Sequence, residues 1–177
     1  MNNEPFEAAV TRHGARVLRV CRAVLGAGPD ADDAWSETFL AALRAWPDLD
    51  PDTNVEAWLV RVAGRKAIDI TRSRSRRGIP LADVGEPAAT DPLWAQSPTA
   101  RHTEIWDEVA ELPQRQRLAI AYHYFGGLPH AETAQLTGST PAAVRRAAAD
   151  GIKALRQRRI AVEPDTSTRP ERKGEPR

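Results

Sequence analysis

The sequence lacks several features that would place it in other classes of protein. Cys21 is the single cysteine among 177 residues, so no internal disulfide can form and a reducing compartment fits. No apolar run approaches the ~20 residues that a membrane-spanning helix needs. The polar start, MNNEPFEAAV, has no basic segment before an apolar run, which argues against a signal peptide. These absences predict a cytoplasmic protein that does not insert into a membrane.

The sequence also lacks the signatures of catalysis and of metal binding. The four histidines have no metal-ligand spacing with Cys21 or with one another. They are His13, His102, His123 and His130. There is no glycine-rich phosphate loop and no nucleophile motif. We therefore expect no enzyme activity, no cofactor and no metal.

Net charge is low, but the charges are unevenly distributed. The formal net charge is only +1, which by itself predicts no nucleic-acid partner. Acidic residues nevertheless predominate from 30 to 56, and basic residues predominate from 61 to 77. The two segments are either solvated faces that attract each other or binding sites for partners of opposite charge.

Helical periodicity dominates what the sequence does contain. A first apolar stripe comprises Val10, Val17, Cys21, Val24 and Leu25. A second helix, capped by Asp30 or Asp32 and stopped by Pro47, carries an apolar face. That predicted face comprises Trp35, Phe39, Ala42, Leu43 and Trp46. A third helix follows a cap at Thr53 or Asn54 and ends near Gly78.

Residues 79–103 interrupt this pattern with several prolines and glycines, which predicts a flexible linker. Trp94 lies within it, and we expect it to pack against a domain. Helical periodicity returns from Glu104, with one helix closed by Gly126 and Gly127. No segment alternates as a strand would. The predicted fold is all-α, with two small helical domains, and residues 161–177 form a disordered tail.

Residues 130–149 have helix-turn-helix spacing. Ala134 is small where two helices cross closely, Gly138 can supply the positive φ of the turn, and Val144 packs the second helix onto the first. Thr140 is a good N-cap and Pro141 a good first residue for that second helix. Taken alone, the spacing fits an ordinary helical hairpin equally well.

The surrounding segments make the pattern specific. ELPQRQRLAIAYHYFGGLPHAETAQLTGSTPAAVRRAAADGIKALRQRR resembles the −35 reading domain of extracytoplasmic-function sigma factors of the sigma-70 family. DADDAWSETFLAALRAW is similar to the polymerase-binding helix of that family, and AWLVRVAGRKAIDITRSRSRR to its −10 segment. The resemblance implies a region 2-like domain over residues 6–78 and a region 4-like domain over residues 104–160. It also implies RNA polymerase core and promoter DNA as partners, and a chain that is monomeric when free.

The resemblance also implies which residues bind. The core-polymerase candidates are Asp32, Asp33, Glu37 and Phe39. Core packing is an equal alternative for Phe39. The −10 candidates are Arg65, Lys66, Arg72, Arg74, Arg76 and Arg77. Arg61 can instead pair with an acid on a neighbouring helix. The −35 candidates are Thr140, Ala142, Ala143, Arg145, Arg146 and Lys153.

The chain departs from the family pattern at several positions. Pro129 replaces the usual capping residue, Thr133 replaces an apolar residue, and Gly64 interrupts the −10 helix. The last helix carries Ala147, Ala149, Asp150 and Gly151, where further bases are common. Two alternative functions remain open, and the departures favour only the second of them. One is a helix-turn-helix regulator that acts without polymerase, which would need a dimer. The other is a degenerate sigma factor that binds polymerase or an anti-sigma factor without starting transcription.

Overall fold

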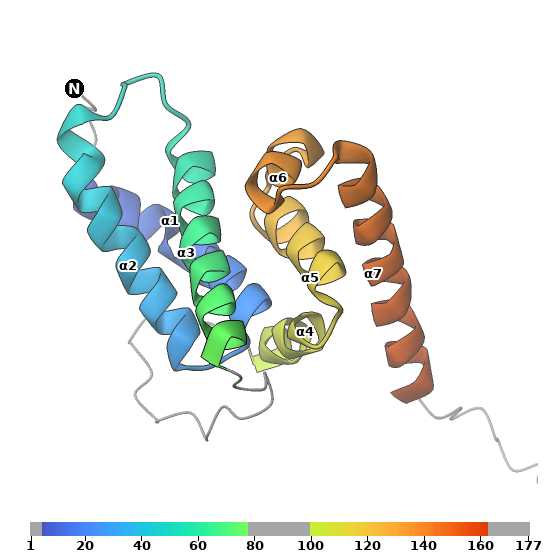
Figure 1. The fold of residues 1–177 in the computed structure, drawn as a ribbon. Helices are drawn as coiled ribbons and strands as arrows, with labels where there is room; N and C mark the ends of the chain where they lie inside the picture. Colours follow the sequence, from blue (N-terminus) through green and yellow to red (C-terminus); the bar gives the residue numbers. More distant parts are fainter. Residues whose placement is uncertain (1–4, 78–99, 163–177) are drawn as a thin grey trace, which may run out of the picture.

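The computed structural model describes residues 5–77 and 100–162, except the side chains at 77, at 100–104 and at 159–162. Within these ranges every regular element is a helix, as predicted (Figure 1). The elements are α1 (Phe6–Leu25), α2 (Pro29–Ala45), the 3₁₀ turn η1 (Trp46–Asp48), α3 (Val55–Arg77), α4 (Ala100–Ala110), α5 (Gln114–Ile120), the π-helical turn η3 (Ala121–Phe125), α6 (His130–Thr137) and α7 (Pro141–Val162). The predicted linker and C-terminal tail, Trp94 included, lie outside the described residues.

Helices α1, α2 and α3 form the first part of the molecule around a shared apolar core. Cys21, Ala34 and Leu59 are fully buried in it, one from each helix. The Asn54 side chain accepts a hydrogen bond from Ala57 N at 3.0 Å, so its predicted role as the cap of α3 is confirmed. The predicted cap of α2 is wrong. That helix begins at Pro29, behind an extended Gly28, and no side chain caps it.

Helices α4 to α7 form the second part. The turn between α6 and α7 is confirmed in detail: Gly138 has φ 64°, and Thr140 Oγ1 accepts a hydrogen bond from Ala143 N at 3.2 Å. Ala134 and Val144 are buried against each other's helices, as the helix-turn-helix spacing predicts. The helix predicted to run up to the two glycines is divided, because α5 gives way to the π-helical turn η3 at Ala121.

The two parts pack against each other. Figure 1 shows α6 beside α3, with α7 on the outer side. Trp106 of α4 and Phe125 of η3 stack edge to face at 4.4 Å between ring centroids, and both belong to the apolar cluster that also contains α1 and α3 residues. One continuous core therefore joins two parts that the sequence predicted as separate domains. Among the described helices, none is both long and apolar enough to cross a membrane.

Candidate functional site

The first turns of α7 present a polar, exposed side to solvent. Val144 and Ala148 face inward onto Ala119 and Ala134, which fixes the rotation of the helix about its axis. The opposite side is consequently exposed. All the predicted −35 residues are exposed on α7 or at its cap, namely Thr140, Ala142, Ala143, Arg145, Arg146 and Lys153. The structure therefore brings this predicted set together on one helix.

Two departures from the family pattern differ in what the structure shows at them. Thr133 is fully buried, where the family pattern has an apolar residue, and its hydroxyl has no hydrogen-bond partner among the described residues. Gly151 lies where α7 crosses α5. A Cβ there would stand 2.7 Å from Ile120 Cδ1, so glycine permits the close approach of the two helices. Asp150 is exposed beside the predicted −35 residues.

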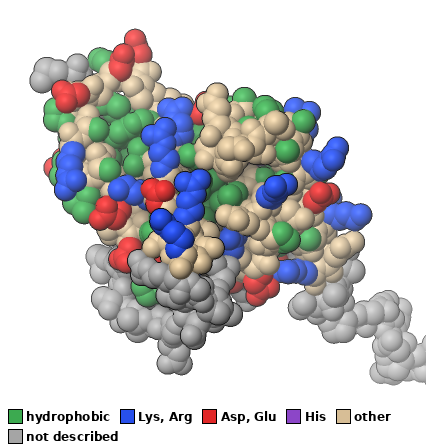
Figure 2. Space-filling model, in the orientation of Figure 1, with side chains coloured by type: hydrophobic (Ala, Val, Ile, Leu, Met, Phe, Trp, Pro, Cys, Tyr) green, Lys and Arg blue, Asp and Glu red, His purple; other side chains and the backbone are tan. Residues whose placement is uncertain are grey.

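The basic residues of α3 include exposed ones and ones that pair with acids of α2. Arg65, Arg72 and Arg76 are exposed, whereas Lys66 and Arg74 pair with acids of α2. Lys66 Nζ lies 3.3 Å from Glu37 Oε2, and Arg74 pairs with Asp30. Figure 2 shows Lys and Arg side chains gathered over α3 and again over α7 on one face of the molecule. The sequence left open whether the acidic and basic segments attract each other, and at these two pairs they do.

The exposed acidic side of α2 also carries two leucines, of which the sequence analysis missed Leu40. Asp33 is exposed, and Leu40 and Leu43 are 49% and 51% exposed. The prediction that Leu43 faces the core is therefore wrong. Because Asp33, Glu37 and Leu40 follow one another at four- and three-residue steps, they lie along one side of the helix. That spacing is the signal by which Leu40 could have been found.

Phe39 packs inside the first part of the molecule. Its side chain is 6% exposed, and its ring lies 4.7 Å from that of Trp35 and 6.3 Å from that of Phe6, between centroids. Of the two roles that the sequence left open for Phe39, the structure supports core packing. Trp46, 9% exposed, also packs on Phe6, with 5.3 Å between centroids.

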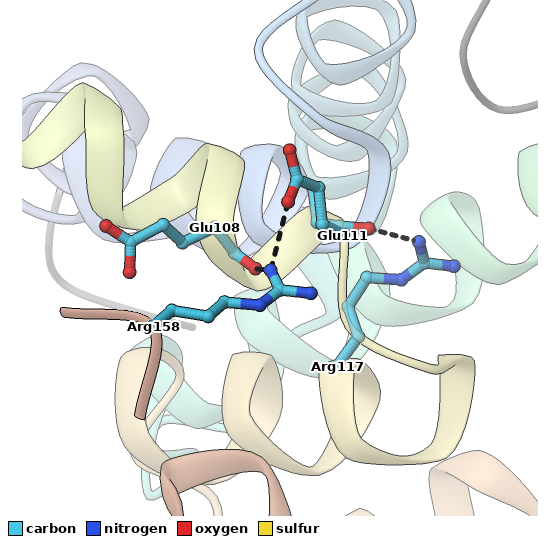
Figure 3. Close-up of polar contacts among 5 residues, drawn as sticks. Glu108, Glu111, Arg117 and Arg158 are labelled. Carbon is cyan, nitrogen blue, oxygen red and sulfur yellow. Dashed lines mark hydrogen bonds and ion pairs between the residues drawn. The ribbon is translucent and has the colours of Figure 1, made fainter. Parts of the chain in front are cut away.

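A second cluster of charged residues links α4, α5 and α7 (Figure 3). Arg158 Nη1 lies 2.9 Å from Glu111 Oε2, and the buried Arg117 donates to Ala110 O at 2.7 Å. Burial lowers the pKa of Arg117 from its usual value. The Arg117 bond satisfies a carbonyl at the C-terminus of α4, so this cluster holds the helices of the second part together rather than presenting a binding surface.

Comparisons with known proteins agree with this geometry. The Sigma-70 region 2 family matches residues 9–77, and the Sigma-70, region 4 family matches residues 102–155. The chain is 32% identical to the ECF RNA polymerase sigma factor SigF of Caulobacter vibrioides over 159 residues, covering 86% of this chain and 87% of SigF. It is 37% identical to the RNA polymerase sigma factor CnrH of Cupriavidus metallidurans over 76 residues, covering 43% of this chain and 40% of CnrH.

Two solved structures share the fold. CnrH in complex with the cytosolic domain of CnrY has a TM-score of 0.58 at 25% identity, covering 89% of both chains. The sigma factor RpoE of Bartonella quintana, in complex with the anti-sigma factor NepR, has a TM-score of 0.67 at 18% identity, covering 90% of this chain and 98% of RpoE. Together with the two family matches and the helix-turn-helix of α6 and α7, these findings show that the chain belongs to the extracytoplasmic-function sigma factors of the sigma-70 family, the non-enzymatic initiation factors that direct RNA polymerase to promoters.

Proposed function

We propose that this sigma factor uses three surfaces in promoter-specific initiation. The exposed side of α2 binds RNA polymerase core, the free bases of α3 bind the −10 element, and the exposed side of α7 binds the −35 element. The observation that carries the proposal is the rotation of α7: Val144 and Ala148 are buried while Arg145 and Arg146 are exposed on the same turns. A recognition helix must present such a side to the major groove.

The proposed polymerase surface combines charge with apolar contact. Asp32, Asp33 and Glu37 supply negative charge, and Leu40 and Leu43 supply exposed apolar area on the same helix. Charged rims orient a partner and raise the association rate, while apolar groups that become buried contribute to affinity. An exposed pair of leucines within an acidic helix fits a partner with a basic, partly apolar surface.

The basic side chains of the proposed −10 surface are not equally available to bind DNA. Arg65, Arg72 and Arg76 are free to contact phosphates. Lys66 and Arg74 are engaged with Glu37 and Asp30, so binding DNA through them requires these pairs to exchange. The Arg77 side chain lies outside the described residues. We therefore assign the first three residues to the initial phosphate contacts.

We propose further that the chain acts in the cytoplasm as a monomer when free, with region 2-like and region 4-like domains over residues 6–78 and 104–160. An anti-sigma factor is a further proposed partner, since the related RpoE is bound to the anti-sigma factor NepR in its solved structure. The shared fold supports this partner class.

The −35 assignment is tested by the double variant Arg145→Ala, Arg146→Ala. Arginine can bind guanine by two hydrogen bonds, each good pair contributing about 1–3 kcal/mol of discrimination, so promoter-specific transcription should fall about tenfold or more. Affinity for core polymerase, measured by fluorescence anisotropy, should be unchanged. Arg115→Ala, Arg156→Ala is the matched control, because it removes the same charge from exposed positions outside the proposed site. An equal loss of transcription in the control would contradict the assignment.

A further inference from the structure

Two histidines of the second part lie face to face beside the helix-turn-helix. His123 belongs to η3 and His130 is the first residue of α6, and their ring centroids are 3.8 Å apart with 28° between the planes. The lone pair of an imidazole nitrogen lies in the plane of its ring, so two stacked rings do not converge on one metal ion. The stack therefore needs an explanation other than metal binding.

The His123 ring is held in place by the turn that precedes α6. Its Nδ1 lies 2.7 Å from the carbonyl oxygen of Leu128, a fully buried residue of that turn. Because a carbonyl oxygen can only accept, Nδ1 carries a proton and donates it to this bond. The neighbouring Tyr124 ring packs edge to face on His123, with 4.9 Å between centroids. His123 is thus a fixed surface on which the partly exposed His130 ring lies.

The surroundings of His130 keep its ring neutral in the free protein. Partial removal from water, the neighbouring His123 ring and Arg145 of α7 each lower the pKa of His130 below its usual value. His130 is therefore neutral at pH 7, since the ordinary pKa of histidine is about 6.5. Arg145 is also one of the proposed −35 residues, so the guanidinium that acts on His130 is exposed beside the proposed DNA surface.

Other charged groups on the elements that pack against α6 are paired or lie elsewhere. Arg61 Nη1 of α3 lies 2.8 Å from Glu132 Oε2 of α6, which confirms the prediction that Arg61 can pair with an acid on a neighbouring helix. Arg115 and Arg117 of α5 lie in its first turn, at the end away from η3. None of these groups supplies an unpaired carboxylate to a charged His130.

DNA would supply the negative charge that a charged His130 needs. A phosphate brought to Arg145 on α7 favours the charged form of His130, because an opposite charge nearby raises the pKa of a histidine. Protonation and DNA binding then strengthen each other, so the complex takes up a proton as it forms.

We propose that His130 is a proton-linked phosphate contact beside the −35 surface: it is neutral in the free protein and binds the promoter backbone as the imidazolium. The stack on His123 places the ring, and the charge of Arg145 keeps it neutral until DNA is bound. The inference deepens the proposed −35 role of α7 and rests on it. Promoter affinity should consequently increase as the pH falls.

Proton NMR of the free protein tests the neutral state without DNA. The ring signal of His130, assigned by its absence in His130→Gln, should titrate with a midpoint below about 6.5, the ordinary pKa of histidine. His123→Gln removes one of the causes that lower the pKa, so the midpoint of His130 should move toward that value. A midpoint at or above the ordinary value in the unchanged protein would overturn the proposal.

Promoter binding by the reconstituted holoenzyme tests the contact itself. The probe is a labelled duplex around one of its own mapped start sites, and affinity is measured by fluorescence anisotropy from about pH 8 to about pH 6 at constant ionic strength. One proton taken up on binding changes affinity by at most about tenfold per pH unit, so affinity should rise about threefold to tenfold over this range. The rise should disappear in His130→Gln.

Two further variants separate charge from structure. His130→Lys carries a fixed charge, so its affinity should no longer vary with pH. His13→Gln is the matched control, because it removes an imidazole from α1, where His13 lies 3.4 Å from Glu56, and it should retain the rise. At about pH 6, the unchanged protein should also lose affinity with salt more steeply than His130→Gln, by about 0.9 in the log–log slope for one phosphate.

The outcomes distinguish the contact from the function on which it rests. Equal pH dependence in His130→Gln and the unchanged protein would overturn the contact, and so would equal salt slopes. Tight promoter binding that does not vary with pH would overturn the contact and leave the −35 role of α7 in place. Absence of promoter binding at every pH would contradict that role, and the contact with it.

Discussion

Thr133 illustrates how much one buried atom can contribute to stability. Its side chain is fully buried, and its hydroxyl has no hydrogen-bond partner in the described part of the chain. A buried hydroxyl that has lost its bonds to water costs about 1–3 kcal/mol when nothing replaces them. The sequence marked Thr133 as a departure from the family pattern. The structure adds the physical reason why that departure carries a cost.

Thr133→Val should therefore stabilise the protein. The substitution keeps the branched shape and removes the unpaired hydroxyl, so the free energy of unfolding in urea should rise by about 1 kcal/mol. Thr38→Val is the matched control. Thr38 is equally buried, but its hydroxyl donates to Ala34 O at 2.6 Å, so the same change there removes a bond that exists. A gain at Thr38 or a loss at Thr133 would contradict this account.

The helices of this chain show which local sequence signals are sufficient to predict helix ends and buried faces, and which are not. The cap at Thr140 and the turn at Gly138 were predictable, because each depends on one residue and its immediate neighbours. The first residue of α2 was not predictable. Pro29 is favoured at the first position of a helix, and Asp30 and Asp32 are favoured as caps, so the sequence offers more than one starting point. Leu43 was assigned to the core because it has helical spacing with the other apolar residues. That spacing does not show where the buried face of a helix ends.

The exposed side of α2 carries a prediction of its own. Asp33→Arg together with Leu40→Ala should weaken binding to core polymerase by about tenfold or more, because the change removes both charge complementarity and apolar contact. Neither residue belongs to the Lys66–Glu37 or Arg74–Asp30 pairs, so α2 and α3 should remain joined. Glu7→Arg with Asp52→Ala, at exposed sites elsewhere, is the control. Retained affinity in the α2 variant would remove this helix from the proposed interface.

The division of the whole molecule into two parts was predictable from sequence, but their docking was not. Apolar periodicity and the residues around Gly138 depend on neighbours within a few positions. The Tyr122–Gly64 bond joins residues 58 positions apart, and no local pattern indicates such a pair. Gly64 was noticed only as an interruption of its helix. Its structural role becomes visible when Tyr122 and Leu136 are placed against it.

The ion pairs between α2 and α3 are likewise contacts that local sequence patterns do not predict. The sequence showed an acidic block beside a basic block and allowed two interpretations. The structure shows that both hold for different residues: Lys66 and Arg74 pair with acids of α2, while Arg65, Arg72 and Arg76 remain exposed. Charge pattern alone cannot divide the set, because the rotation of α3 against α2 decides which bases reach an acid.

The measurement that tests the central claim most directly is transcription of fragmented genomic DNA by purified core polymerase, with and without this protein, followed by sequencing of transcript 5′ ends. A sigma factor with these surfaces should produce new start sites that share sequence motifs near −10 and −35. It should lose most of those starts in the Arg145→Ala, Arg146→Ala variant. Core binding without any new start sites would contradict the account and favour a degenerate sigma factor that serves only as an interaction protein.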